Sequence, residues 1–171
     1  KQSPLFTFLY EKSMHHASRT LPEVEYNETT GEYGETGNII LNEGDPIEYV
    51  EFAPDALEII FDNIVSNACC HGFKDRTNNV IKIELKSEGV NYVIVISNNG
   101  SAIHTQIKPE EVFVYGKTSK MGKSAEKDET HFGIGGYEVQ KLMHEFGGDA
   151  EFISDTESDF PVSYKLTFYN T

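Results

Sequence analysis

The chain has 171 residues, of which 28 are acidic and 14 are basic, so its formal net charge is −14. This length matches a single domain that can bury its own hydrophobic core. The acidic balance argues against a nucleic-acid partner, because such a protein needs a basic surface to neutralise phosphates. No apolar run approaches the roughly 20 residues that span a bilayer, and the first ten residues lack the pattern of a signal peptide. We therefore expect no membrane contact by this chain.

The first 55 residues carry more than half of the excess negative charge, because eleven acidic and three basic residues give −8. The apolar beginning predicts a helix over residues 5–20, and the polar, glycine-rich stretch Glu28–Gly37 predicts a loop or a hairpin turn. Two strands are expected at Asn38–Leu41 and Ile47–Phe52, on either side of a turn at Asn42–Pro46. This acidic segment is either a partner-binding surface or a solvated face with an inserted hairpin.

The next segment has the periodicity of an amphipathic helix that begins at Pro54 and ends at Gly72. Its apolar residues recur at helical spacing and form one stripe: Leu57, Ile60, Phe61, Ile64, Val65 and Ala68. Beside the stripe, Asn63 and Asn67 are four residues apart, so we expect their side chains on one flank of the helix, at the edge of the core.

The two cysteines of the chain, Cys69 and Cys70, are adjacent and lie inside this helical pattern. Neighbouring cysteines rarely form a disulfide, so we expect buried, reduced thiols and a cytoplasmic location. A metal site with His71 is disfavoured, because three consecutive residues of a helix point in different directions.

The middle of the chain predicts a hairpin, a short helix and a long loop. Val80–Lys86 and Tyr92–Ser97 alternate or run apolar around a turn at Glu88–Asn91, which is typical of two antiparallel strands. A short helix is expected from Pro109. The stretch Gly116–Phe132 has no apolar periodicity and carries four lysines, so we expect a long functional loop there.

The last third predicts a helix and two strands. Gly133–Gly136 leads into the helix, which Gly147 and Gly148 end, and its apolar stripe is Val139, Leu142, Met143 and Phe146. The strands are expected at Glu151–Ser154 and Val162–Tyr169. This order of elements predicts an α+β fold, a two-layer α/β sandwich with helices on one face of a mostly antiparallel, mixed sheet. We expect residues 55–171 to form the core, with 116–132 as a lid, and residues 1–54 to extend the same domain.

Four features follow one another along the chain: the helix with Asn63 and Asn67, the strand end Asn98–Ile103, the lysine-rich loop, and the glycines Gly133–Gly136. Each is weak alone, but their order and spacing resemble the nucleotide-binding domain of sensor histidine kinases, in the GHKL superfamily of ATPases and kinases. The resemblance covers Asp55–Tyr169, about two thirds of the chain. It implies ATP and Mg²⁺ as cofactors and phosphoryl transfer as the reaction.

The resemblance implies that Asn67 coordinates a Mg²⁺ ion that bridges the nucleotide phosphates. An amide oxygen suits a hard ion that keeps part of its water shell. Asn63, the catalytic candidate, lies one turn earlier, where gyrase-like relatives have a glutamate that acts as general base. An amide cannot accept a proton in this way, so transfer to a protein acceptor is favoured over hydrolysis. The resemblance implies a lysine at the position of Cys70, and either His71 or Lys74 is expected to substitute for it.

The resemblance also implies which residues bind the adenine base and which bind the phosphates. Asn98 replaces the family's aspartate, whose carboxylate accepts a hydrogen bond from the adenine amino group; Gly100 allows close approach to the base and Ile103 packs on it. Phe113 and Tyr115 are expected to anchor the lid, and the residues that face the phosphates are Lys117, Thr118 and Lys120. Backbone N–H groups at a helix N-terminus bind anions, which assigns Gly133, Ile134, Gly135 and Gly136 to the phosphates.

The chain departs from the family's pattern at Cys70, Asn98, Ala102 and His131. Two alternatives therefore stand beside the kinase: a degenerate, non-catalytic module that regulates or binds a partner, and an ATPase or serine kinase of the same superfamily. A histidine kinase needs a phosphoacceptor histidine, and we interpret His15 and His16 as ordinary helix residues. The acceptor is then expected on a dimerisation domain upstream of Lys1, in the cytosolic part of a longer sensor, with a response regulator as the indirect partner.

Overall fold

The computed structural model of the chain describes residues 26–27, 32–33, 39–43, 54–73, 76, 78–102, 108–114 and 134–169. Here η1 is a turn of π-helix and η2 a turn of 3₁₀-helix. Among the described residues the elements follow in the order β1 (Tyr26–Asn27), β2 (Glu32–Tyr33), β3 (Ile39–Glu43), α2 (Pro54–Asn67), η1 (Ala68–Gly72), β4 (Ile81–Glu88), β5 (Asn91–Asn98), η2 (Pro109–Phe113), α3 (Ile134–Glu145), β6 (Gly148–Ser154) and β7 (Val162–Phe168).

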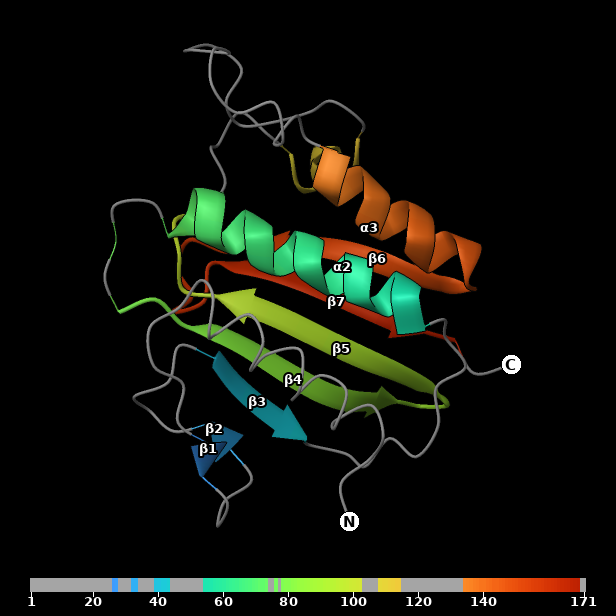
Figure 1. Cartoon of the computed structure of the whole chain (residues 1–171), viewed down its shortest axis with the longest axis horizontal. Helices are drawn as coiled ribbons and strands as arrows, with labels where there is room; N and C mark the ends of the chain where they lie inside the picture. Colours follow the sequence, from blue (N-terminus) through green and yellow to red (C-terminus); the bar gives the residue numbers. More distant parts are fainter. Residues whose placement is uncertain are drawn as a thin grey trace.

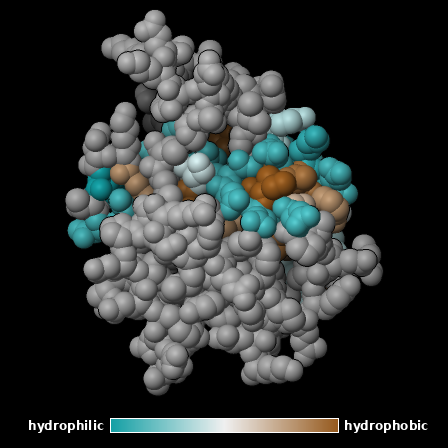
Figure 2. Space-filling view, viewed as in Figure 1, coloured by the Kyte–Doolittle hydropathy of each residue, from teal (hydrophilic) through white to brown (hydrophobic). Residues whose placement is uncertain are grey.

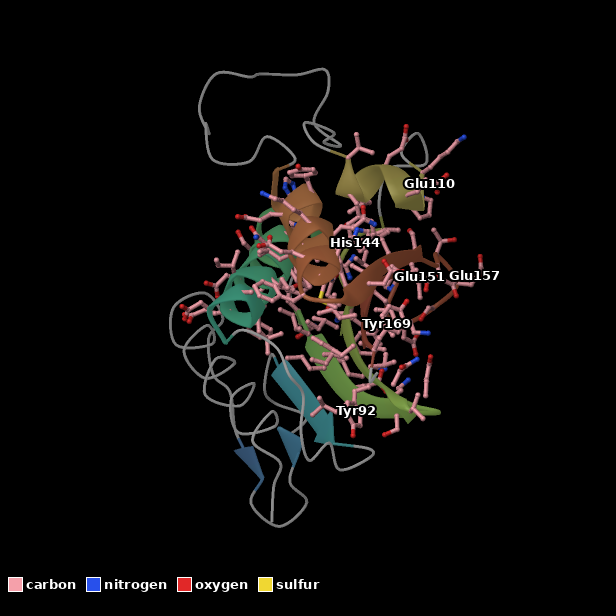
Figure 3. The ribbon with its side chains drawn as sticks, turned by 90° about the vertical axis from the view of Figure 1, so that its right-hand side faces the viewer. Tyr92, Glu110, His144, Glu151, Glu157 and Tyr169 are labelled. Atoms are coloured by element: carbon pink, nitrogen blue, oxygen red, sulfur yellow. The ribbon has the colours of Figure 1, made fainter. Side chains whose placement is uncertain are left out.

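In the part of the chain that the structure describes, five strands form one sheet in the order β3-β4-β5-β7-β6. β3 runs parallel to β4, and the other neighbouring pairs are antiparallel. The helices α2 and α3 pack against each other on one face of this sheet (Figure 1), and the side view separates the two layers (Figure 3). The prediction of an α+β, two-layer sandwich with a mostly antiparallel, mixed sheet is confirmed.

The hydrophobic core lies between the two layers, because alternate residues of each strand point towards the helices. Ile83, Ile96, Tyr164 and Phe152 form one row across four strands, and each is at most 5% exposed. From above, the predicted apolar stripe of α2 is buried in the same core: Leu57, Ile60, Phe61, Ile64, Val65 and Ala68. Burial of this stripe orients α2 on the sheet and thereby places its flanking residues.

The predicted hairpin of β4 and β5 is confirmed, with strands slightly longer than expected. Glu88 pairs with Asn91, so the turn consists of Gly89 and Val90 alone. Gly89 has a φ of 63°, a conformation that glycine adopts readily because it has no Cβ.

In the N-terminal third, β1 and β2 pair antiparallel, which agrees with a hairpin in that stretch. The predicted start of the following turn is wrong, because Asn42 and Glu43 continue β3 and pair with β4. The helix expected over residues 5–20 and the strand expected at Ile47–Phe52 lie outside the described residues.

The C-terminal ends of α2 and α3 have different structures. α2 ends at Asn67, and the π-turn η1 completes the segment to Gly72, with the N–H of Phe73 donating to the carbonyl of Ala68 at 2.8 Å. α3 ends at Glu145, and the glycine predicted to end it, Gly147, follows in a turn with a φ of 80°, which is typical of the glycine after a helix. Phe146 is wrongly predicted as core: it lies in the turn after α3 and is 41% exposed.

The visible face of the described residues is mostly hydrophilic, with apolar areas between the hydrophilic side chains (Figure 2). The exposed large apolar side chains of the helical layer include Ile59, Tyr137 and Phe146. Within the described ranges, no helix is both long enough and apolar enough to cross a membrane.

Candidate functional site

The described site residues come from three places that the fold brings to one end of the helical layer. α2 and η1 carry Asn67 and Gly72, the end of β5 carries Asn98, and α3 begins beside η2 (Figure 1). α3 contacts both α2 and η2, so the first and the third of these places are connected through packed elements.

The loop after β5 packs directly on the end of η1. The N–H of Ser101 donates to the carbonyl of Gly72 at 2.9 Å. A Cβ on Gly100 would lie 2.7 Å from the carbonyl carbon and oxygen of Gly72, and a Cβ on Gly72 would lie 3.2 Å from Oδ1 of Asn98. Glycine is therefore required at position 100 for this close approach, whereas a side chain at position 72 would make a tight contact with Asn98. The missing side chain of Gly100 makes room for Gly72, a contact that the resemblance did not predict.

Asn98 is 4% exposed, and its side chain turns back onto its own loop. Its Oδ1 accepts the N–H of Gly100 at 3.0 Å, which identifies the oxygen of this amide. The Nδ2 group is then the atom turned away from Gly100. Asparagine at this position therefore presents a hydrogen-bond donor where an aspartate would present a second acceptor, although Oδ1 keeps one more lone pair.

Asn67 is directed towards the sheet by a buried tyrosine. Its Nδ2 donates to the hydroxyl of Tyr164 on β7 at 3.3 Å. Burial raises the pKa of Tyr164 to about 12, and the hydrogen bond from Asn67 opposes this shift. The phenol of Tyr164 is therefore neutral at physiological pH. Oδ1 of Asn67 is the amide atom turned away from the Tyr164 hydroxyl.

Asn63 is directed towards α3 instead. Its Nδ2 donates to Oε2 of Glu138 at 3.0 Å, in a partly buried position between the two helices. Glu138 lies in the second turn of α3, so the contact brings a carboxylate to the side-chain amide of Asn63. Hydrogen bonds with an ionised acceptor are among the stronger ones in proteins.

The segment η2 is fixed between α3 and the core. Phe113 is 6% exposed and its ring meets the ring of Tyr164 edge-on at 6.4 Å, so Phe113 anchors the segment before the predicted lid. A Cβ on Gly136 would lie 2.1 Å from the carbonyl oxygen of Val112. The missing side chain of Gly136 therefore allows α3 to pack against η2, a role that the resemblance did not predict.

The remaining predicted site residues divide into two groups. His71 is half-buried in η1, and Ile134 and Gly135 begin α3. Outside the described residues lie Ile103, Tyr115, Lys117, Thr118, Lys120 and Gly133, together with the predicted lid, 116–132.

The side-chain amide of Asn67 fits a Mg²⁺ ion that binds together with a polyphosphate. In the described part of the chain, no three His, Cys, Asp or Glu side chains are grouped so that they could hold a metal ion. An ion at this site would depend on one amide oxygen, with phosphate oxygens and water completing its shell, and Mg²⁺ accepts such a shell. The orientation of Asn67, with Nδ2 on Tyr164, suits this arrangement.

The sequence alone did not identify Tyr164 or Glu138 as members of the site. Tyr164 has a detectable pattern, because its hydroxyl is the polar exception among Val162, Leu166 and Phe168 on the core face of β7. A buried tyrosine hydroxyl usually has a hydrogen-bond partner. Glu138 has no such pattern, since its contact depends on how α2 and α3 are placed relative to each other.

Comparison with known proteins identifies the family of the chain. The model of the family "Histidine kinase-, DNA gyrase B-, and HSP90-like ATPase" matches residues 52–168. The chain therefore belongs to this family of ATP-binding proteins, which are enzymes of the kinase and ATPase type. Among curated proteins there is no match.

Solved structures of histidine kinases share the fold. A mycobacterial sensor histidine kinase, MprB, has a TM-score of 0.68 at 15% identity, over 96% of this chain and 94% of that one. The catalytic domain of histidine kinase ThkA has a TM-score of 0.68 at 17% identity, over 98% and 95%. The ATP-binding domain of PrrB from Mycobacterium tuberculosis has a TM-score of 0.63 at 18% identity, over 98% and 94%. The architecture is thus that of histidine kinase catalytic domains.

Proposed function

We propose that the chain is the ATP-binding catalytic domain of a cytoplasmic sensor histidine kinase, which binds Mg–ATP and presents the γ-phosphate to a histidine on a separate dimerisation domain. The observation that carries the proposal is the junction of η1 with the loop after β5, where Ser101 binds the Gly72 carbonyl at 2.9 Å. This junction brings the helix end that carries Asn67 to the strand end that carries Asn98. A response regulator is the expected recipient of the phosphoryl group.

Each residue of the proposed site has one task. Asn98 orients the adenine, and Asn67 holds Mg²⁺, which neutralises phosphate charge when bound. The backbone N–H groups of Gly133–Gly136 and the side chains of Lys117, Thr118 and Lys120 balance the remaining charge. Asn63 supports the γ-phosphate beside Asn67.

Thermal unfolding in the presence of nucleotide tests the proposal. Millimolar Mg–ATP should raise the unfolding temperature of the chain, because a ligand that binds only the folded state stabilises it. Asn67→Ala should lose the Mg²⁺-dependent part of this rise. Ile59→Ala, an exposed change on the same helix, should retain it. The absence of any stabilisation would instead support the non-catalytic, regulatory alternative.

Phosphotransfer is tested in the longer protein that contains the dimerisation domain. Incubation with ATP labelled on the γ-phosphate should give an acid-labile, base-stable label, as expected for phosphohistidine. An acid-stable label would indicate a serine kinase instead.

A second candidate function, ATP hydrolysis, is favoured by the position of Glu138, whose carboxylate lies 3.0 Å from Nδ2 of Asn63. Gyrase-like relatives have a glutamate general base at the position of Asn63, and the carboxylate of Glu138 on α3 would take over that role. The carboxylate would accept a proton from water as the water oxygen bonds to the γ-phosphorus and the bond to ADP breaks, yielding ADP and phosphate.

Phosphate release by the isolated chain separates hydrolysis from transfer. If Glu138 acts as the base, Glu138→Gln should reduce release about 100-fold or more, while the control Glu145→Gln, at the far end of α3, should not. If the wild-type chain binds Mg–ATP but releases no phosphate, hydrolysis is rejected and the kinase proposal stands.

A further inference from the structure

Tyr164 connects three parts of the site through one buried side chain. It is 4% exposed on β7, and its hydroxyl accepts the hydrogen bond from Nδ2 of Asn67, a residue 97 positions away along the chain. Its ring lies edge-on to Phe152 at 5.0 Å, with the planes at 80°, and edge-on to Phe113 at 6.4 Å, with the planes at 70°. The two phenylalanines hold the ring in one orientation, which fixes the hydroxyl beneath α2.

Packing alone does not explain a tyrosine at this position. The neighbouring core residues of the same strand, Val162 and Leu166, are apolar, and a phenylalanine ring would fill the same space. Burying a hydroxyl costs free energy unless it is hydrogen-bonded, and the Tyr164 hydroxyl is hydrogen-bonded by the side chain of Asn67.

We propose that Tyr164 is a positioning residue for Asn67, which holds the amide so that Oδ1 faces the metal side of the site. The inference rests on the proposed function, in which Asn67 binds Mg²⁺. An asparagine amide has two ends of similar size, one that suits a cation and one that repels it. When Nδ2 donates to the Tyr164 hydroxyl, the oxygen is the end that remains for the ion. Partners that orient a metal ligand in this way tune metal affinity without touching the metal.

The edge-on contact with Phe113 extends this arrangement to η2. Phe113 is the last residue of η2, which precedes the predicted lid. A displacement of η2 would therefore move the Tyr164 ring and, through its hydroxyl, the amide of Asn67.

The test is the Mg²⁺ dependence of nucleotide binding by Tyr164→Phe, which removes the hydroxyl and retains the ring. Binding of a non-hydrolysable ATP analogue is titrated by calorimetry at a series of Mg²⁺ concentrations and in EDTA. We expect the half-saturating Mg²⁺ concentration to rise about tenfold, the lower end of the effects seen for such partners, with unchanged affinity in EDTA. The side-chain NH₂ resonance of Asn67 should also shift in a ¹H–¹⁵N spectrum.

Two control variants make the result specific. Tyr92→Phe removes a hydroxyl from β5, at a place remote from η2, as the labelled positions of Tyr92 and of Glu110 in η2 show (Figure 3). This variant should leave the Mg²⁺ dependence unchanged. In an Asn67→Ala background, Tyr164→Phe should have no further effect on the Mg²⁺ dependence, because the side chain that it positions is absent.

Three outcomes would overturn the inference. One is an unchanged half-saturating Mg²⁺ concentration in Tyr164→Phe, and another is an equal loss of affinity with and without Mg²⁺, which indicates a merely structural role. In both cases the wild-type chain binds Mg²⁺ and nucleotide, so the proposed function survives. If the wild-type chain binds no nucleotide, the inference and the proposed function fail together.

Discussion

The side-chain amide of Asn63 donates to the carboxylate of Glu138 at 3.0 Å, and this hydrogen bond joins α2 to α3. The two residues lie 75 positions apart in the chain. The contact therefore fixes the relative position of the two helices that border the site, in addition to any part that either residue has in the chemistry.

Loss of this contact should destabilise the fold. A hydrogen bond to a charged group contributes about 1.5–3 kcal/mol when well formed, so Glu138→Ala should lower the free energy of unfolding by about 1–2 kcal/mol. Urea unfolding followed by circular dichroism measures the difference. Glu145→Ala, an exposed change on the same helix, should change the stability by less than about 0.5 kcal/mol. Equal effects of the two variants would contradict a stabilising Asn63–Glu138 contact.

Replacement of Asn98 by aspartate should strengthen ATP binding. The carboxylate can accept the N–H of Gly100 with one oxygen and the adenine amino group with the other, whereas Asn98 presents Nδ2 there. We expect ATP affinity to rise about fivefold to tenfold, a gain of about 1 kcal/mol, measured by calorimetry.

The control for this variant is Asn99→Asp. It introduces the same charge at the next residue, whose Oδ1 accepts the N–H of Val80 at 2.7 Å and whose Nδ2 donates to the carbonyl of Asn78. Asn99→Asp should not raise ATP affinity. A weaker complex in Asn98→Asp would indicate that the donor on Nδ2 faces an acceptor of the ligand.

Gly100→Ala should abolish nucleotide binding, because a Cβ there would lie 2.7 Å from the Gly72 backbone and would separate η1 from the loop after β5. Such overpacking costs about 1–3 kcal/mol of stability. The matched control is Gly89→Ala in the β4–β5 turn. Its Cβ would meet no atom within 4 Å, so its φ of +63° should cost about 1 kcal/mol without affecting binding. Wild-type nucleotide affinity in Gly100→Ala would refute the junction as the base of the site.

Gly136→Ala should separate η2 from α3, since the new Cβ would lie 2.1 Å from the carbonyl oxygen of Val112. We expect a loss of about 1–3 kcal/mol and faster hydrogen exchange in η2, measured by mass spectrometry. The acceleration in β4 and β5 should be smaller than in η2, because these core strands respond only to the loss of global stability. Uniform acceleration over the whole chain would show global destabilisation instead.

Alkaline pH should reduce stability through Tyr164. Burial raises the pKa of this phenol to about 12, whereas a tyrosine in the unfolded chain ionises near pH 10. The folded state therefore binds more protons between these values, so the contribution is complete below pH 10 and is lost as the pH rises to 12. The loss amounts to roughly 2–3 kcal/mol at most. In urea unfolding at pH 9, 10.5 and 11.5, the difference in the free energy of unfolding between the wild type and Tyr164→Phe should shrink as the pH rises. A difference that stays constant with pH would contradict this prediction.

The long periodic segments were predictable because their pattern is local. The stripe from Leu57 to Ala68 and the alternation in β4 and β5 are enough to define α2 and the hairpin. The parallel pairing of β3 with β4 was not predictable, since it joins residues about 40 positions apart and leaves no local signature. The prediction for Phe146 was wrong because the helical spacing of apolar residues continues one residue beyond the end of α3.

For the candidate site, the sequence predicted which asparagines matter, whereas their partners required the fold. The contacts of Asn63 with Glu138 and of Asn67 with Tyr164 cross from α2 to a helix and to a strand near the C-terminus. The two glycine contacts are similar in kind, since Gly72 and Gly136 meet backbone from other parts of the chain. Contacts of this type are set by tertiary packing, on which a local pattern carries no information.

The pairing of β3 with β4 determines where the chain can be shortened. The family match begins at residue 52, whereas β3 ends at Glu43, so a protein cut to the matching residues would lose this strand. The N–H and C=O groups along one side of β4, between Ile81 and Leu85, would then be open to pairing with another molecule. A soluble, monomeric fragment should therefore begin before residue 39, and one that begins at residue 52 should self-associate.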